Sequence, residues 1–179
     1  MNRDLTTLEC ALLGLLVEEP RTGYGLRQVF ASTPMAHYGD SPGAIYPALR
    51  RLEAAGLVTG KSASDGRGTR ILRATSKGRT ALRRWLKRPI GPSDVVWRGP
   101  ELLLKFSFME DLGDAKTTRA FLETYAAANA AEAESATAWL RGDGRDATPH
   151  ARAAVQHGID LHKAKAAWAR KALSKLSGR

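Results

Sequence analysis

The 179-residue sequence predicts a mainly α-helical chain of the α+β class, with short helices and a two-stranded hairpin in its first half and long helices in its second. Apolar residues recur at helical spacing through most of the chain. Two short runs of β-forming residues flank an Asp-Gly turn signal. Residues 89–100, with three prolines and two glycines, separate the halves. We therefore expect domains at 1–88 and 101–179, joined by a linker at 89–100.

The chain opens with two predicted helices. Thr6 and Glu9 have the spacing of a capping box, in which a hydroxyl and a carboxylate bind the free amides of a helix start. Leucines follow at helical spacing until Pro20, which ends the helix. A second helix is expected over residues 23–32.

A third helix is expected to start near Ser41 and to end at Gly56, a residue that readily adopts the left-handed conformation of a helix stop. Its apolar stripe consists of Ile45, Leu49 and Leu52. Pro47 lacks the amide that a helix interior needs, so it fits best within the first turn. We therefore expect regular helix to begin close to Gly43.

A hairpin and a fourth helix complete the first half. Two short strands, at 57–59 and 69–72, flank the polar loop 61–68. Thr75 then caps a helix that runs to about Arg88. Three helices, a hairpin and a further helix in this order are typical of a winged helix-turn-helix module with a two-stranded wing.

The second half predicts an all-α domain with helices at about 101–112, 114–141 and 149–177. These helices are rich in alanine and their apolar stripes are narrow, so each buries too little surface to be stable alone. We expect them to pair with a second subunit and to form a dimerisation domain. The alternative is a self-contained helical bundle.

The net charge of +10 is concentrated in the first half. Residues 1–88 contain 15 Lys/Arg and 7 Asp/Glu, whereas residues 89–179 contain 13 and 11. A positive field of this kind attracts nucleic acid foremost and anionic membrane next. The alternative is a basic surface that is simply solvated.

The composition excludes several classes of protein. The single cysteine, Cys10, rules out an internal disulfide framework and a cysteine zinc site. No apolar run is long enough to span a bilayer, and the N-terminus lacks the build of a secretory signal. We expect a cytoplasmic protein that does not act on membranes.

The third predicted helix has the features of a helix that reads the major groove of double-stranded DNA. With its apolar stripe inward, Tyr46 and Arg50 lie on the outer side, where an arginine can donate two hydrogen bonds to guanine. Cations of the predicted wing reach phosphates or the minor groove. Solvated arginines and a plain surface loop are the alternatives. The DNA-binding residues we expect are Tyr24, Arg27, Ser41, Gly43, Ala44, Tyr46, Pro47, Arg50, Arg51, Lys61, Arg67 and Arg70.

Over about residues 5–88 the sequence resembles the PadR family of bacterial transcriptional regulators. The resemblance is carried by Leu13-Gly14-Leu15-Leu16, by Gly23-Tyr24-Gly25-Leu26, by the run Gly43-Ala44-Ile45-Tyr46-Pro47 that continues to Gly56-Leu57-Val58, and by Thr75-Ser76-Lys77-Gly78. More loosely, Glu101-Leu102-Leu103-Leu104-Lys105-Phe106 resembles the start of the helical C-terminal domain in longer members. The second wing strand departs from the family, which usually has an aromatic residue near Leu72 and a leucine near Ala74.

The resemblance implies a ligand-responsive repressor that binds a pseudo-palindromic operator as a homodimer. The C-terminal helices and the first helix would form the dimer, and the two recognition helices would enter successive major grooves. A small aromatic effector is expected, with Trp97 and Trp85 as candidate binding residues; packing of these rings in the core or an interface is the alternative.

No enzymatic activity is expected. The sequence has no nucleophile elbow and no phosphate-binding glycine loop. His157 and His162 are five apart, which is poor geometry for sharing a metal, so neither a metal nor a cofactor is expected. The rival interpretation is a helical interaction protein whose winged helix binds protein or RNA.

Overall fold

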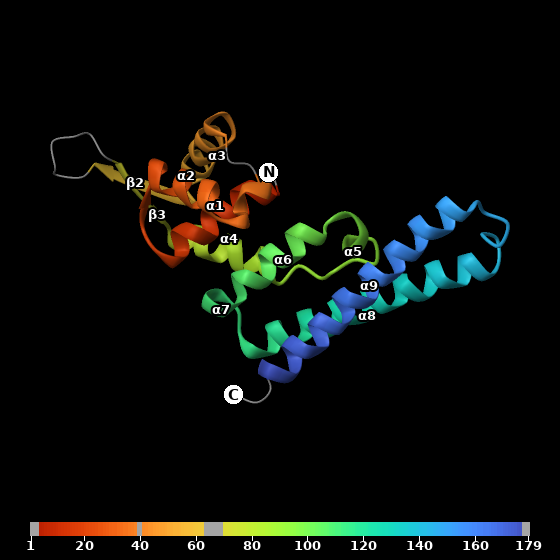
Figure 1. Cartoon of the computed structure of the whole chain (residues 1–179). Helices are drawn as coiled ribbons and strands as arrows, with labels where there is room; N and C mark the ends of the chain where they lie inside the picture. Colours follow the sequence, from red (N-terminus) through yellow and green to blue (C-terminus); the bar gives the residue numbers. More distant parts are fainter. Residues whose placement is uncertain (1–3, 39–40, 63–69, 177–179) are drawn as a thin grey trace. The chain divides into compact units, whose positions relative to one another are not determined.

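The structure is a computed structural model that describes residues 4–38, 41–62 and 70–176. Its contacts divide the chain into two compact units (Figure 1). The first comprises residues 1–88 with 103–113, and the second comprises 89–102 with 114–179. The predicted division into domains at 1–88 and 101–179 stays a prediction. In the structure, residues 103–113 group with the first unit.

The first unit is a winged helix-turn-helix fold, so the predicted fold class is confirmed. Its elements are α1 (Thr7–Glu18), β1 (Arg21–Thr22), α2 (Gly23–Ser32), the 3-10 helix η1 (Pro34–Tyr38), α3 (Pro42–Ala54), β2 (Val58–Ser62), β3 (Arg70–Ala74), α4 (Ser76–Leu86) and α7 (Met109–Leu112). The capping box at Thr6 and Glu9 is present. The sheet is antiparallel in the order β1-β3-β2. The two-residue strand β1 was not foreseen, because it is too short to show a period-two pattern.

Hydrogen bonds join the end of α3 to the start of α4. Gly56 has a φ of 69°, and the Leu57 amide donates to the Leu52 carbonyl at 2.9 Å, which completes a Schellman-type stop. The Thr75 hydroxyl accepts from the Gly78 amide at 3.0 Å and donates to the Gly56 carbonyl at 2.8 Å. These contacts set the angle at which α3 leaves the core.

Pro47 lies inside α3, five residues after Pro42, so the expectation that it belongs to the first turn is wrong. Its missing amide removes only the hydrogen bond to the Gly43 carbonyl. Because Gly43 is exposed, water can satisfy that carbonyl. The first turn is held instead by the amides of Ala44 and Ile45, which both donate to the Ser41 carbonyl.

The predicted helix at 101–112 is broken into α6 (Gly99–Ser107) and α7. The break occurs at Phe108, which is buried against α1, where a methyl group added to Gly14 would lie 2.3 Å from the Phe108 ring. The buried Lys105 of α6 makes a second contact with the first unit's other helices. Its Nζ donates to the Arg88 carbonyl at 3.0 Å, just past the end of α4. The partial negative charge at the C-terminal end of α4 also stabilises the Lys105 cation at this position.

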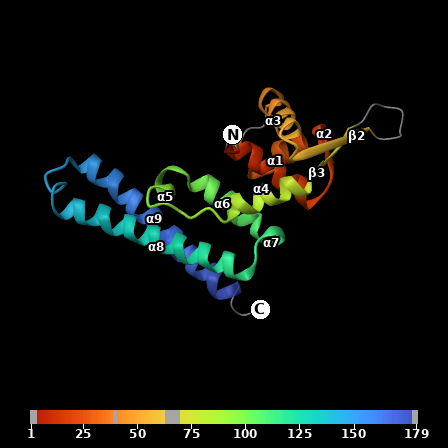
Figure 2. The same cartoon turned by 180° about the vertical axis from the view of Figure 1, so that it is seen from behind.

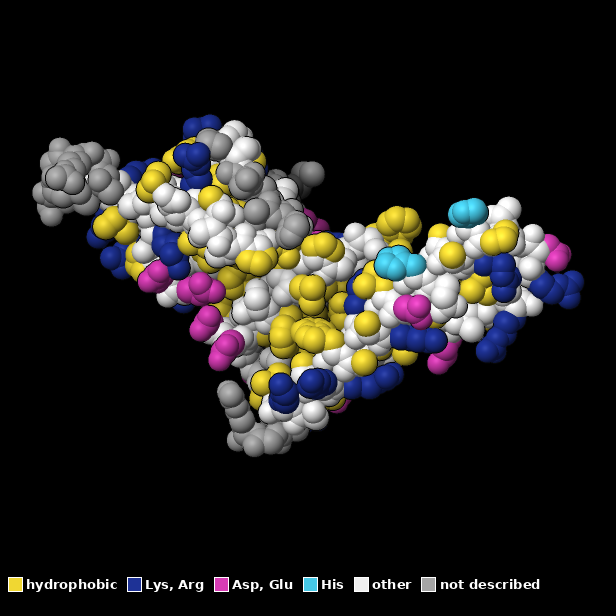
Figure 3. Space-filling view, in the orientation of Figure 1, with side chains coloured by type: hydrophobic (Ala, Val, Ile, Leu, Met, Phe, Trp, Pro, Cys, Tyr) yellow, Lys and Arg dark blue, Asp and Glu magenta, His cyan; other side chains and the backbone are white. Residues whose placement is uncertain are grey.

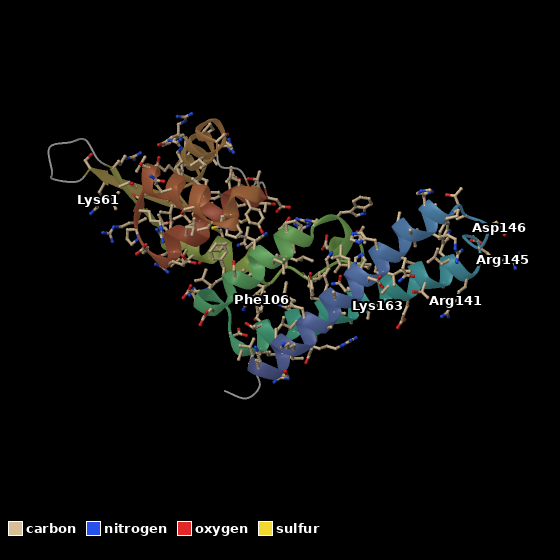
Figure 4. All side chains as sticks on the ribbon, viewed as in Figure 1. Lys61, Phe106, Arg141, Arg145, Asp146 and Lys163 are labelled. Carbon is tan, nitrogen blue, oxygen red and sulfur yellow. The ribbon has the colours of Figure 1, made fainter. Side chains whose placement is uncertain are left out.

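The second unit is built on a helical hairpin. α8 (Ala115–Arg141) and α9 (Pro149–Leu176) lie side by side and antiparallel in both views (Figures 1 and 2). The short helix α5 (Asp94–Trp97) contacts α8. The connection between α8 and α9 carries Arg145 and Asp146, and Arg141 is the last residue of α8 (Figure 4). No helix of the described residues is both long and apolar enough to cross a membrane.

A polar cluster lies between α8 and α9. Asn129 is buried; its Nδ2 donates to the Tyr125 carbonyl at 2.8 Å, and its Oδ1 lies 2.8 Å from His162 Nδ1. Since Nδ2 is the donor of the amide, Oδ1 is the acceptor and the imidazole donates from Nδ1. The Tyr125 ring packs edge-on against Trp168, with centroids 5.8 Å apart. The cluster therefore specifies one register of the hairpin.

Acidification should weaken this hairpin through His162. Burial lowers the pKa of His162 below its usual 6.5, and the nearby Lys165 charge lowers it further against the opposing effect of Glu132. The neutral imidazole therefore stabilises the fold above pH 6.5, and this stability is lost as the pH falls through the folded-state pKa. Thermal melting between pH 7.5 and 5.5 should show a smaller decrease for His162→Gln than for the wild type. His157→Gln, at an exposed position on the same helix, is the matched control and should follow the wild type.

Candidate nucleic-acid interface

The helix α3 divides into a buried face and an exposed face. Ile45, Ala48, Leu49 and Leu52 are buried, and the helix packs on α1 and α2. Tyr46 is 39% exposed, and Arg50, one turn further along, is exposed as well. The buried stripe is as the sequence predicts, and it leaves Tyr46 and Arg50 together on the outer side.

Tyr46 lies against the start of α2. A methyl group added to Gly23 would lie 2.9 Å from Cε1 of the Tyr46 ring, so the ring rests on the glycine and is held there. The Thr22 hydroxyl caps α2 by accepting from the Gly25 amide at 2.9 Å. The segment Gly23-Tyr24-Gly25 thus allows α2 and α3 to approach closely beside the exposed face of α3.

The exposed side of α2 continues this surface. Tyr24 is 59% exposed and Arg27 is exposed. Gln28, one turn after Tyr24, donates from Nε2 to the Tyr24 hydroxyl. This leaves the hydroxyl hydrogen of Tyr24 free to be donated outward. Sequence reasoning identified Tyr24 and Arg27 but not Gln28.

The start of α3 is open to solvent. Ser41 and Gly43 are exposed, Ala44 and Pro47 are half-buried, and the Ser41 side chain makes no capping hydrogen bond to the described part of the helix. The partial positive charge of this helix N-terminus is therefore accessible to a partner. Small residues at this point permit a close approach of the backbone to a partner.

The base of the predicted wing supplies one exposed lysine. Lys61 lies at the outer end of β2 with its side chain exposed (Figure 4). Arg67, predicted to lie at the tip of the wing, is outside the described residues. Arg70, at the start of β3, forms an ion pair with Glu53 of α3, with Nη2 and Oε1 2.8 Å apart.

Arg51 is also held by a carboxylate. Its Nε donates at 2.7 Å to Oε1 of Glu9, whose side chain is completely buried, while the other carboxylate oxygen accepts from the Thr6 amide at 3.0 Å. Glu9 therefore completes the cap of α1 and joins α1 to α3. Residues 1–88 contain only seven acidic residues, and Glu9 is one of them. An acidic residue on the buried face of a helix needs a cationic partner, and this was the signal for an ion pair that the helical spacing alone did not reveal.

The two candidate effector residues lie in different units. Trp97 ends α5 and is 82% exposed, which makes it the most exposed large apolar side chain among the second unit's described residues. Trp85 of α4 is half-buried, and the Lys105 ammonium lies 5.5 Å from its ring centroid. The Trp85 ring face is therefore already used within the first unit by a cation–π contact.

The surface over α2 and α3 carries Lys and Arg side chains (Figure 3). Within the part of the chain that the structure describes, Arg27, Arg50 and Lys61 are exposed and have no carboxylate partner, whereas Arg51 and Arg70 are paired. Among the described residues, no group of His, Cys, Asp and Glu is placed to hold a metal ion. The arrangement can bind a polyanion along a helix and a hairpin.

Comparison with known sequences finds two family models that match separate parts of the chain. Residues 12–84 match the transcriptional regulator PadR-like family, and residues 100–177 match the family described as virulence activator alpha C-term. A transcriptional regulator of Mycobacterium tuberculosis is 54% identical over 46 residues, which are 25% of this chain and 43% of that protein. The match thus spans less than half the length of that curated relative.

Several solved structures match the chain over most of its length. A PadR-like transcriptional regulator from Bacillus cereus is 20% identical, with a TM-score of 0.40 over 96% of this chain and 98% of that one. Bacillus subtilis PadR in complex with operator DNA is 17% identical, with a TM-score of 0.43 over 96% and 99%. The same protein in complex with p-coumaric acid is 18% identical, with a TM-score of 0.41 over 99% of both chains.

Proposed function

We propose that the chain is a transcriptional regulator that binds a specific double-stranded DNA sequence through α3, α2 and the base of its wing. Support comes from residues 12–84, which match the PadR-like family, a family of transcriptional regulators and not of enzymes. The observation that carries the proposal is the division of α3. Its apolar stripe is buried, and Tyr46 and Arg50 are presented together on the open side. A major groove admits a helix of this kind.

The exposed residues have separate roles in this proposal. Arg50 donates two hydrogen bonds to a guanine and carries sequence discrimination. Tyr46 contacts a base or phosphate beside it. Phosphates are bound by the residues around the helix and at the wing base, which position the protein more than they read sequence: Tyr24, Arg27, Ser41, Lys61 and, beyond the described residues, Arg67.

The chain acts as a homodimer on a pseudo-palindromic operator. Support comes from the second unit, which exposes several large apolar side chains: Trp97, Trp139, Leu161, Trp168 and Leu176. Exposed apolar side chains along α5, α8 and α9 offer surface that another subunit can cover. A two-fold dimer presents two copies of α3 to half-sites about one helical turn apart, or a multiple of it.

The regulator represses by occupying its operator in the cytoplasm and is released by a small aromatic effector. The exposed Trp97 supports this part, since its free ring face suits an aromatic ligand. Trp85 contributes less, because Lys105 already lies over its ring.

Replacing Arg50 by glutamine tests the proposal. The preference for the operator over a shuffled duplex should fall about 100- to 10,000-fold, the effect of losing one bidentate base contact in each of two half-sites. Binding to the shuffled duplex should change only a few-fold. Fluorescence anisotropy on the DNA upstream of the chain's own gene, or on genomic fragments selected by the protein, measures both affinities. The stoichiometry should be two chains per duplex.

Arg73→Gln is the matched control. Arg73 is exposed on β3, so this variant loses the same charge without touching α3. It should weaken both duplexes alike. Equal loss of discrimination in the two variants would remove Arg50 from the reading role. Tighter binding of an RNA hairpin than of any duplex would instead favour an RNA-binding winged helix.

A further inference from the structure

Arg70 joins the wing to the third helix through both ends of its guanidinium. Nη1 donates to Glu53 Oε2 at 3.0 Å, and Nη2 lies 2.8 Å from Oε1. Arg70 is the first residue of β3, and Glu53 is in the last turn of α3. A bidentate ion pair of this kind fixes the orientation of the two side chains as well as their distance. It also occupies the terminal nitrogens through which arginine binds a phosphate.

Gly60 leaves the space in which this guanidinium lies. A methyl group added to Gly60 would lie 2.6 Å from Arg70 Nε and 2.7 Å from Cζ. Since Ser62 pairs with Arg70 and Gly60 with Leu72, the Arg70 side chain crosses diagonally over β2 on its way to α3. Any side chain at position 60 would push the guanidinium away from Glu53. The two strands and the helix are thus held at one point.

Glu53 holds Arg70 in place. Its side chain is only 21% exposed, and Oε1 is buried with no directed hydrogen bond from the described residues beyond the ion pair with Arg70. If Arg70 turned outward to a phosphate, a half-buried negative charge would be left without its partner at the edge of a polyanion-binding surface. A single phosphate contact at an exposed position does not offset that loss.

We infer that Arg70, with Glu53 and Gly60, is a positioning residue that sets the angle between wing and recognition helix, and that it does not bind DNA phosphate itself. The inference rests on the proposed function, because the angle matters only if α3 and the wing contact one duplex together. It separates Arg70 from Lys61, which lies on the neighbouring strand of the same hairpin and is exposed with no carboxylate partner among the described residues.

A double-mutant cycle on operator affinity, repeated across a salt series, tests this role. Arg70→Gln and Glu53→Gln should each weaken operator binding about 5- to 10-fold, and the double variant should be no weaker than either single one. The slope of log affinity against log salt should stay at the wild-type value in all three. Lys61→Gln should reduce the slope by about 1.8, because each dimer loses two phosphate contacts worth about 0.9 each.

Two further variants separate the geometry of the pair from its charge. Gly60→Val keeps both charges and should reproduce the Arg70→Gln affinity with an unchanged slope. A cycle of Glu53→Gln with Arg73→Gln should be additive, because Glu53 forms its ion pair with Arg70 and not with Arg73.

The opposite results are equally clear. A slope reduced by about 1.8 in Arg70→Gln, together with tighter binding by Glu53→Gln, would make Arg70 a phosphate contact that Glu53 restrains, and would overturn the inference. Absence of salt-dependent duplex binding by the wild-type protein would overturn the proposed function instead. In that case, amide hydrogen exchange in β2 and β3 that is faster in both single variants would show that the pair still holds the wing.

Discussion

Replacing Gly78 by alanine should destabilise the first unit by about 3 kcal/mol, at the upper end of the range for overpacking a closed core. The added methyl group would lie 2.2 Å from the Leu57 carbonyl oxygen and 3.1 Å from Leu13 Cδ1. The oxygen belongs to the backbone between α3 and β2, so it cannot swing away as a side chain would. Urea denaturation of the variant and the wild type measures the loss.

Gly158→Ala is the matched control for that experiment. Gly158 lies within α9, and no atom of the described residues outside its own helical turn lies within 4 Å of the position that its methyl group would take. Alanine favours a helix over glycine, so the control should gain up to about 1 kcal/mol. Equal stability of Gly78→Ala and the wild type would mean that α4 does not pack as closely on the α3–β2 junction as the structure indicates.

Replacing Arg51 by alanine should cost about 2 kcal/mol of stability, although its neighbour Arg50 can be replaced with a loss below about 0.5 kcal/mol. Arg51 forms an ion pair with the fully buried Glu9, and its removal would take this counter-charge away from the carboxylate. The cost lies below the range of about 3–5 kcal/mol for a fully buried pair, because the Arg51 side chain is 48% exposed and water can take its place.

The double variant Glu9→Gln, Arg51→Ala shows whether the charge is the cause. Glutamine at position 9 keeps an acceptor for the Thr6 amide but needs no counter-charge. The double variant should therefore recover part of the stability lost in Arg51→Ala, as read by thermal melting. Arg51→Ala with unchanged melting and a strong loss of DNA binding would instead assign Arg51 to the DNA, as the sequence alone suggested.

Much of the fold is decided by local features that a sequence displays. The capping box at Thr6 and Glu9, the buried stripe of α3 and the threonine cap of α4 were each predicted and are present. Each depends on residues within a few positions of one another, so spacing and residue type are sufficient to identify it.

Other features depend on residues that meet only after folding. Strand β1 exists because β3 offers it a partner about 50 residues later, and two residues alone carry no periodicity. The break at Phe108 occurs because that ring fills the space left by Gly14. Pro47 is accepted in the second turn of α3 because the carbonyl that it leaves without a helical partner belongs to the exposed residue Gly43, where water can bind it.

The sequence by itself determined the order of the elements and which helix presents its polar face. Only the tertiary structure decided which arginines on that face are available. Arg50 and Arg51 are adjacent and chemically identical, yet packing of α1 on α3 brings Glu9 to Arg51 alone. In the same way, the wing register places Arg70 on Glu53 and leaves Lys61 exposed. An ion pair forms between side chains that meet in space, and local spacing along a chain does not reveal which long-range pairs will meet.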